Sequence, residues 1–256
     1  MTFSEDLIVH WVGMVTLVSF RVFGALLAMP LFAFKAINMR LKIFLSLAIA
    51  LLLSPMILPK DPVFAGGVDT FMGAAIELAI GACAGYLIRI GMLAFDVLAE
   101  TLSMLAGFSF ATAYARDPNV SSGLVGEFLH LTVIAMAFAM NLHVAFLDLI
   151  LKSFKAIPFG QWPDAWNAQM VVDIVIQSFQ LGMVLTLPSV VIYLVFNMMQ
   201  AILSRTSPQL NLFSVGFAVT IPIAFVLLAI FLPDLPVAVQ RAFHGPLQYI
   251  RQGLLP

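Results

Sequence analysis

Two long apolar runs without charged side chains occupy the C-terminal part of the chain. Residues 174–204 and 206–233 contain no Asp, Glu, Lys, Arg or His. A helix that crosses a bilayer needs about 20 consecutive apolar residues, so each run is long enough to span. A short polar break, 205–213, lies where the two runs meet. The pattern predicts a membrane helix hairpin whose turn holds Pro208, because proline disfavours helical backbone at the residue before it.

The apolar pattern along the whole chain predicts six helical regions: 7–34, 41–58, 70–106, 124–151, 170–204 and 210–232. A helix over 70–106 would be about 55 Å long, against a hydrocarbon core of about 30 Å. It is therefore expected to kink, to tilt strongly or to extend beyond the bilayer. Pro188 is expected to kink the fifth region. A short amphipathic surface helix is expected in the tail.

The expected fold is all-α: a single integral membrane domain, 1–256, of long hydrophobic helices with a re-entrant or plug loop. The parts of this domain are the N-terminal helices, the candidate plug loop, a middle helix with its loop, the C-terminal helix hairpin and the amphipathic tail. Their ranges are 1–106, 107–123, 124–168, 169–233 and 234–256. The sequence contains no internal repeat.

The distribution of basic residues predicts an orientation, because short loops rich in Lys and Arg mark the cytoplasmic side. The basic stretch 35–42 places the first connection inside and the N-terminus outside, in the periplasm. Lys152 and Lys155 would lie outside if all six regions crossed simply. They would lie inside if 107–123 were a re-entrant loop that does not complete a crossing. The charge bias therefore favours a re-entrant loop there.

The amino-acid composition excludes several classes of protein. The chain is 62% hydrophobic and 10% charged, whereas a soluble domain carries about 25% charged residues. No soluble catalytic or nucleotide-binding domain has room between the apolar runs. The net charge of −1 leaves no basic stripe for nucleic acid. Cys83 is the single cysteine, which excludes an internal disulfide and a cysteine-based metal cluster. No Lys or Arg precedes Arg21, so the first run is expected to be retained rather than cleaved as a signal.

The polar break also carries a motif. Its residues are Arg205, Pro208, Gln209, Leu210, Asn211 and Phe213, and Val-Gly-Phe follows at 215–217. This motif resembles the FliR family, a component of the flagellar type III export gate that is related to the T component of injectisomes. Weaker similarities follow in order along nearly the whole chain, at Arg21, 35–42, 77–85, 107–118 and 153–160.

The resemblance implies a structural and gating subunit of the flagellar export gate, built to pack in a hetero-oligomeric helical channel for unfolded flagellar proteins. It implies the P, Q and B components of that gate as partners, with membrane lipid around the assembly. The implied location is the bacterial inner membrane, at the flagellar basal body. No cofactor, nucleotide or nucleic acid is expected, so energy would come from other components.

The segment 107–123 mixes small, hydroxylated and aromatic residues between two glycines, and it contains the turn signal Asp-Pro-Asn. One interpretation is an ordinary loop outside the membrane. The other, which the resemblance implies, is a plug that closes a protein-conducting pore with aromatic bulk and uses the glycines as hinges. The candidate gate residues are Gly107, Phe108, Ser109, Phe110, Tyr114, Asp117 and Pro118.

Charges inside the apolar runs form a second candidate group, because a charge in a bilayer is costly and is normally paired or hydrated. These candidates are Arg21, Glu77, Arg89, Asp96 and Glu100. The last two are four residues apart and share a helix face with Arg89. Three interpretations stay open: buried ion pairs that fix helix register, charges that lie outside the lipid, and a proton or ion relay.

Small residues surround Glu77. Gly73, Gly81 and Gly85 recur at helical spacing, and such small residues let helix backbones approach closely. Helix packing is the natural interpretation.

Catalytic chemistry is not expected. Glu127-x-x-His130 has the spacing used in di-iron bundles, but the sequence has no second copy. No phosphate-binding loop, zinc-protease motif or nucleophile elbow is present. The alternative to an export-gate subunit is a self-contained secondary transporter of a small solute that uses the intramembrane charges. The missing repeat and the motif at 205–213 favour the gate.

Overall fold

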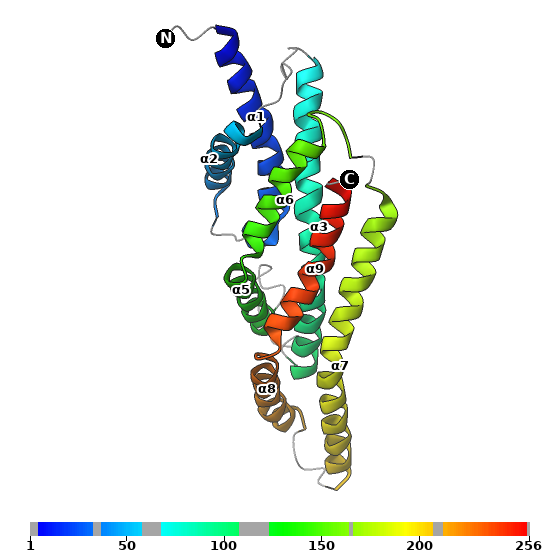
Figure 1. The fold of residues 1–256 in the computed structure, drawn as a ribbon. Coiled ribbons are helices and arrows are strands. Elements are labelled where there is room, and N and C mark those ends of the chain that lie inside the picture. The colour runs from blue at the N-terminus through cyan, green and yellow to red at the C-terminus, as the bar shows by residue number, and fades with distance from the viewer. Residues whose placement is uncertain are drawn as a thin grey trace. The chain divides into compact units, whose positions relative to one another are not determined.

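The structure is a computed structural model, and it describes residues 5–32, 37–57, 68–107, 123–163, 166–206 and 212–254. Helices make up most of these described residues, and no strand occurs among them. The elements are α1 (Glu5–Ala28), the 3-10 helix η1 (Pro30–Phe32), α2 (Met39–Ile57), α3 (Val68–Ala106), α5 (Gly123–Ala139), α6 (Leu142–Ala156), α7 (Ala168–Thr206), α8 (Leu212–Phe231) and α9 (Leu235–Leu254) (Figure 1). The prediction of an all-α fold is confirmed.

Four predicted regions agree with α2, α3, α7 and α8 to within two residues at each end. The helix α3 is unbroken over 39 residues, and α7 continues through Pro188. The first predicted region, about 7–34, is expected to end near Pro30, and α1 does end at Ala28, with the separate helix η1 beginning at Pro30. Proline restrains the residue before it from helical backbone, which accounts for the end of α1.

The prediction of one helix over 124–151 is wrong. The structure has two helices there, α5 and α6, and α6 continues to Ala156. Asn141 lies at the break with φ 56° and ψ 26°, in the left-handed region. Asparagine visits this conformation more readily than most residues, so a local backbone choice interrupts an apolar run that looks continuous in the sequence.

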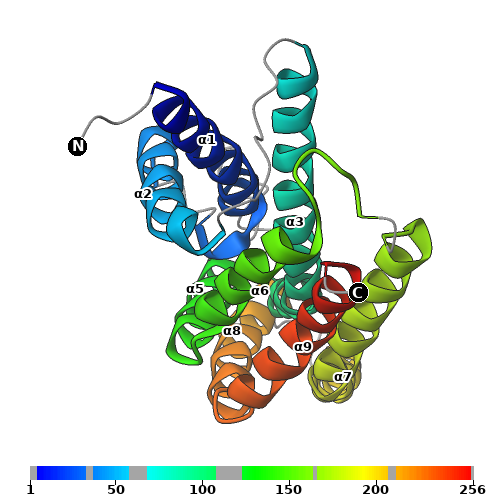
Figure 2. The same ribbon diagram turned by 45° about the horizontal axis from the view of Figure 1, so that its top comes forward.

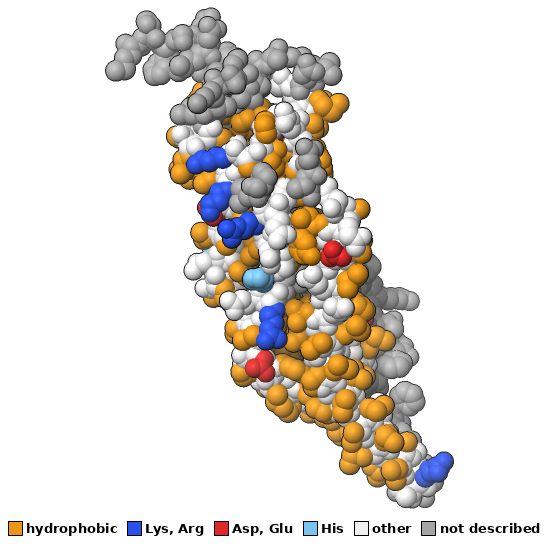
Figure 3. All heavy atoms as spheres, turned by 45° about the vertical axis from the view of Figure 1, so that its right-hand side comes forward, with side chains coloured by type: hydrophobic (Ala, Val, Ile, Leu, Met, Phe, Trp, Pro, Cys, Tyr) orange, Lys and Arg blue, Asp and Glu red, His pale blue; other side chains and the backbone are white. Residues whose placement is uncertain are grey.

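Among the described residues, four helices are long and apolar enough to cross a membrane, and the number rises to six if the bent pairs α5–α6 and α8–α9 each count as one span. The four windows are Trp11–Ala28, Met39–Ile57, Thr70–Ala106 and Ala168–Thr206. Of their residues, 56% and 61% are buried in α1 and α3, but only 22% in α2 and in α7. The last two therefore present most of their apolar surface outward, and Figure 3 shows a face on which hydrophobic side chains predominate.

The contacts divide the chain into two compact units, each assembled from segments that are distant in sequence. The first unit comprises Met1–Gly91, Met140–Ile174 and Phe243–Pro256. The second comprises Met92–Ala139 and Val175–Ala242.

Glycines set the packing of the first unit. The helix α1 lies beside α2 in both ribbon views (Figures 1 and 2) and packs closely against α3. A Cβ at Gly24 would overlap the Leu78 carbonyl, and a Cβ at Gly81 would overlap the Arg21 carbonyl. This is the close approach of two helices that the glycine spacing on α3 predicts. Gly24, the glycine of α1 at this contact, was not predicted from the sequence.

The tail forms a longer helix than a short surface element. The helix α9 has 20 residues, with Val239 and Phe243 buried while Arg241 and Arg251 are exposed. The predicted amphipathic character is therefore present, and its apolar face is covered by protein.

Candidate functional site

The candidate plug lies almost entirely outside the described residues. Phe108, Ser109, Phe110, Tyr114, Asp117 and Pro118 fall within 108–122, which the structure does not describe. The first residue of the segment is described. Gly107 follows the last residue of α3 with φ 82°, and its N–H donates a hydrogen bond to the Met104 carbonyl at 3.1 Å. Glycine adopts this left-handed conformation without steric cost, so α3 ends where the candidate plug begins.

Two buried hydroxyl groups hold this end of α3 in the second unit. The Thr220 hydroxyl of α8 donates to the Ala106 carbonyl at 3.0 Å. The Tyr193 hydroxyl of α7 donates to the Thr220 carbonyl at 2.8 Å, and the Tyr193 side chain is fully buried. A carbonyl at the end of a helix has no partner within that helix, so Thr220 satisfies it. The point at which the chain leaves α3 is thereby fixed to α7 and α8.

The hairpin-turn motif is described only at its edges. Pro208, Gln209, Leu210 and Asn211 lie outside the described residues, and Phe213 lies in α8 with its side chain outside the description. Arg205 is exposed in the last turn of α7, where a positive charge complements the helix dipole. The structure therefore describes the two helices that the motif joins, α7 and α8.

Arg21 of α1 and Glu77 of α3 form an ion pair in the first unit. Both side chains have no exposed surface. Arg21 Nε donates to Glu77 Oε2 at 2.5 Å, and Nη2 donates to Oε1 at 3.0 Å. This is the two-pronged arrangement in which arginine binds a carboxylate most strongly.

Further groups complete the cluster around the ion pair. Arg21 Nη1 donates to Ser153 Oγ at 2.9 Å, and the Gly160 N–H donates to Glu77 Oε1 at 3.0 Å. The Phe154 ring lies 4.3 Å from Arg21 Cζ, a cation–π contact. Gly160 has φ +76°, which places its N–H in a turn that residues with a Cβ rarely adopt. The cluster joins α1, α3, α6 and the connection after α6.

The geometry of Arg21 and Glu77 distinguishes a structural ion pair from a proton or ion relay. Leaving one buried charge unpaired costs several kcal/mol, about 3–5 when a partner is removed. Here each charge meets the other, and neutral hydrogen-bonding groups occupy further sites on both. Because neither side chain is exposed, the arrangement favours a fixed structural ion pair over a relay, which needs access to water or to a further titratable group.

The other candidate charges have different environments. Arg89 and Glu100 are exposed on α3. Asp96 is 45% exposed and its carboxylate contacts His130 Nε2 of α5. Glu127 and His130 have the sequence spacing of a di-iron ligand motif. Among the described residues, however, no three His, Cys, Asp or Glu side chains gather to hold a metal ion.

Several partners were not assigned a role from the sequence. Ser153, Phe154 and Gly160 belong to one of the weaker similarity motifs, and that motif was the signal available for them. Tyr193 and Thr220 have apolar neighbours on both sides in the sequence and lie within the long uncharged runs. The sequence signal for them is the cost of leaving such groups without a hydrogen bond inside apolar surroundings.

Comparison with known proteins identifies the family. The family model for bacterial export proteins, family 1, matches residues 12–245. The flagellar biosynthetic protein FliR of Caulobacter vibrioides is 32% identical, over 84% of this chain and 86% of that protein. FliR of Pectobacterium carotovorum subsp. carotovorum is 26% identical over 95% and 93% of the two chains. FliR of Escherichia coli (strain K12) is 24% identical over 83% and 82%.

The family model covers most of the chain, and the relatives match it over most of their own length. The chain therefore belongs to the FliR family of bacterial export proteins.

Proposed function

We propose that this chain is a structural and gating subunit of the flagellar type III export gate, which forms part of the channel for unfolded flagellar proteins and contributes residues 107–123 as a plug. Its family makes it a component of the flagellar export apparatus. The observation that carries the gating role is the end of α3. There Gly107 begins the segment in a conformation suited to glycine, directly after a carbonyl that Thr220 holds. A fixed anchor followed by a glycine is what a movable plug needs at its base.

The outward-facing apolar helices support a role within an assembly. The helices α2 and α7 have span length, yet only 22% of the residues in each are buried within the chain. Such surfaces are covered either by lipid or by other apolar helices. In this proposal the P and Q components pack beside the chain, and the B component meets its cytoplasmic turns or its tail. The N-terminus lies in the periplasm, in line with the basic stretch 35–42.

The sequence also bears on the source of energy for export. The chain carries no phosphate-binding loop, so in this proposal the subunit gates passively and other components supply energy. The alternative of a self-contained secondary transporter has no support from the family, whose named relatives are flagellar biosynthetic proteins.

Removing the bulk of the plug tests the gating role. Replacing residues 108–113 by an equally long Gly-Ser segment should make cells permeable to small solutes, because Phe108 and Phe110, two of the aromatic side chains that fill the pore in this proposal, are lost. Solute uptake or single-channel conductance of the purified assembly would measure the leak. Export of flagellar subunits should continue.

The control is a Gly-Ser replacement of the same length at residues 61–66, between α2 and α3, which should leave permeability unchanged. The plug-replaced chain must also co-purify with its partners in normal amounts. A sealed membrane in an assembly of normal composition would show that 107–123 is an ordinary loop.

A further inference from the structure

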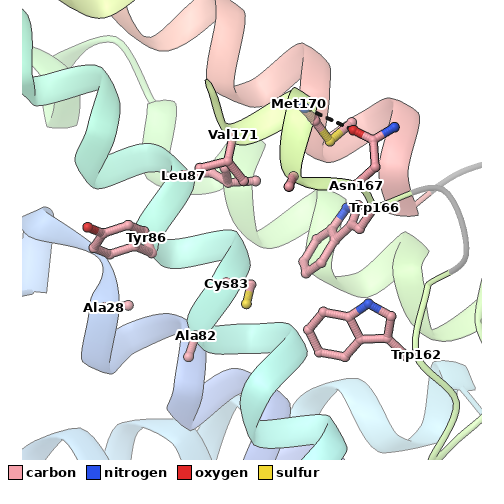
Figure 4. Close-up of a pocket in the computed structure, with 11 residues that line it drawn as sticks. Ala28, Ala82, Cys83, Tyr86, Leu87, Trp162, Trp166, Asn167, Met170 and Val171 are labelled. Atoms are coloured by element: carbon pink, nitrogen blue, oxygen red, sulfur yellow. Dashed lines mark hydrogen bonds between the residues drawn. The ribbon is translucent and has the colours of Figure 1, made fainter. Parts of the chain in front are cut away.

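The pocket of the first unit carries no charged group (Figure 4). It has a volume of about 490 Å³, and the rings of Trp162 and Trp166 flank it together with Cys83. Asn167 Oδ1 accepts a hydrogen bond from the Met170 N–H at 2.9 Å, so this oxygen is already engaged (Figure 4). The lining contains no carboxylate, histidine, lysine or arginine. The charged side chains that the ion pair of Arg21 and Glu77 does not use therefore lie outside this pocket.

Asp96 of α3 and His130 of α5 form an ion pair in the second unit. His130 Nε2 contacts Asp96 Oδ1. An ionised carboxylate can only accept hydrogen bonds, so the imidazole donates from Nε2. The side chains of Asp96 and His130 are 45% and 39% exposed. The pair therefore joins two helices through residues that lie 34 positions apart in the sequence, and both groups are open to exchange with water.

This exposure distinguishes the pair from Arg21 and Glu77. Those two side chains have no exposed surface, and an arginine stays charged at every pH that a folded protein meets. Histidine changes its charge between about pH 5 and 8. An exposed pair that contains histidine can therefore be switched by protons, whereas the buried arginine pair cannot.

The nearest charges on the two helices are acidic. Glu127 precedes His130 by one turn of α5, and Glu100 follows Asp96 by one turn of α3. Both glutamates are exposed, as is normal for charges in span-length helices that face water. When His130 is neutral, α3 contributes two carboxylates and α5 contributes one without a positive charge between them. Like charges repel, so loss of the imidazolium changes attraction between these helices into repulsion.

The other elements of the second unit add little to this balance. Residues 175–204 of α7 and 212–231 of α8 contain no Asp, Glu, Lys, Arg or His. The titratable side chain in that part of α7 is Tyr193, whose hydroxyl donates to the Thr220 carbonyl. Arg89 precedes Asp96 on the same face of α3 and is exposed. The remaining described charges of the second unit are exposed too: Arg205, Asp234 and Arg241.

We propose that His130 and Asp96 form a proton-sensitive latch between α3 and α5. With the imidazole protonated, its positive charge lies against the Asp96 carboxylate and the two helices are held together. When the proton passes to water, a weaker hydrogen bond is left and the carboxylates repel each other. The latch is therefore tight at the acidic end of the histidine range and loose at the alkaline end. It gives the subunit a response to protons of its own, which passive gating does not require.

Two spin labels test the latch. The full chain with Cys83→Ser, Met104→Cys and Ala135→Cys is purified with its co-purifying subunits and labelled with nitroxides. Met104 on α3 and Ala135 on α5 are exposed, and Cys83 is the single native cysteine. Pulsed EPR gives the distribution of label–label distances at about pH 6 and about pH 8, on the two sides of the histidine range. We expect a shift to longer distances and a broader distribution at the higher pH.

Substitutions within the pair separate a histidine response from a general effect of pH. In His130→Arg the charge persists at both pH values, so the distances should be equal and should match those of the unaltered latch at the lower pH. Asp96→Asn removes the charged partner and should give the longer distances at both pH values. His244→Arg is the matched control, because His244 is an exposed histidine of α9 outside the pair, and it should keep the shift.

Three outcomes would overturn the proposal. Equal distances at both pH values with His130 and Asp96 in place would mean that protons do not act on this contact. A shift that persists in His130→Arg would mean that another group responds. Loss of the shift in His244→Arg would place the response outside the pair. Each variant must retain the subunit composition of the unaltered complex, and if Asp96→Asn does not, the comparison of His130→Arg with His244→Arg decides by itself.

Discussion

Glu77 accepts three hydrogen bonds although its side chain has no exposed surface. Two come from the Arg21 guanidinium and one from the Gly160 N–H. In apolar surroundings a carboxylate is tolerated only when its charge and its lone pairs are matched. The cluster therefore sets the relative positions of α1, α3 and the connection after α6 with one residue from each.

Breaking this pair should destabilise the chain more than removing both charges. Glu77→Ala leaves Arg21 buried without its counter-charge, at a cost of about 3–5 kcal/mol. Arg21→Met combined with Glu77→Met should cost less, because it leaves no buried charge. Denaturant unfolding of the purified chain in mild detergent would measure the free energy of unfolding of each variant.

Glu100→Ala is the matched control, since Glu100 is an exposed carboxylate on the same helix. Its effect should stay within about 0.5 kcal/mol. Should Glu77→Ala be no worse than Glu100→Ala, the ion pair has no structural role.

At the scale of elements, single residues decide where helices end. Gly107 terminates α3 with φ 82°, and Asn141 separates α5 from α6 with φ 56°. Pro30 follows the end of α1. Each is a residue whose backbone preference differs from that of a helix interior. The motif residues Pro208 and Asn211 lie between α7 and α8, where the same kind of local preference is expected.

The turn between α7 and α8 is expected to matter for assembly or export. Pro208→Ala combined with Asn211→Ala removes the helix-terminating ring and an amide that can satisfy free backbone groups or a neighbouring subunit. Reduced swimming motility and reduced recovery of the chain in the assembled complex would be the readouts.

Ser204→Ala with Ser214→Ala, on either side of the motif, serves as the control and should keep normal export. Normal export from the Pro208/Asn211 double variant would mean that the motif is only a turn.

In the whole molecule, the exposed apolar surface of α2 and α7 has to be covered by lipid, detergent or other subunits. The helices α2 and α7 are span-length and mostly uncovered by the rest of the chain. The side chains of Leu52 on α2 and Ile202 on α7 are 75% and 66% exposed. A chain with so much exposed hydrocarbon is stable only in lipid, in detergent or against other subunits.

Purification from native membranes in mild detergent should therefore recover the chain with other helical components of the export apparatus in fixed proportions. Mass spectrometry would identify them, with a tagged membrane protein from the same cells as the control for non-specific recovery. A monodisperse chain that purifies alone would contradict the assembly proposed above.

Much of the fold could be predicted, because the responsible forces act locally. The bounds of α3 and α7 follow from where their apolar runs begin and end, because a helix satisfies its own backbone groups in apolar surroundings. The break at Asn141 could not be predicted, because asparagine tolerates both helical and left-handed backbone. The candidate charges were found from their cost in apolar surroundings, but their partners were not.

Composition, run length and motif order are enough to predict an all-helical membrane protein of the FliR type, because none of the three depends on how the chain packs. Which polar groups meet could be learned from the folded structure alone. Arg21 finds Glu77 at 56 residues and Ser153 at 132 residues along the chain, and Asp96 contacts His130. Helix periodicity assigns a residue to a face, but the partner that the face meets depends on how all the helices pack together.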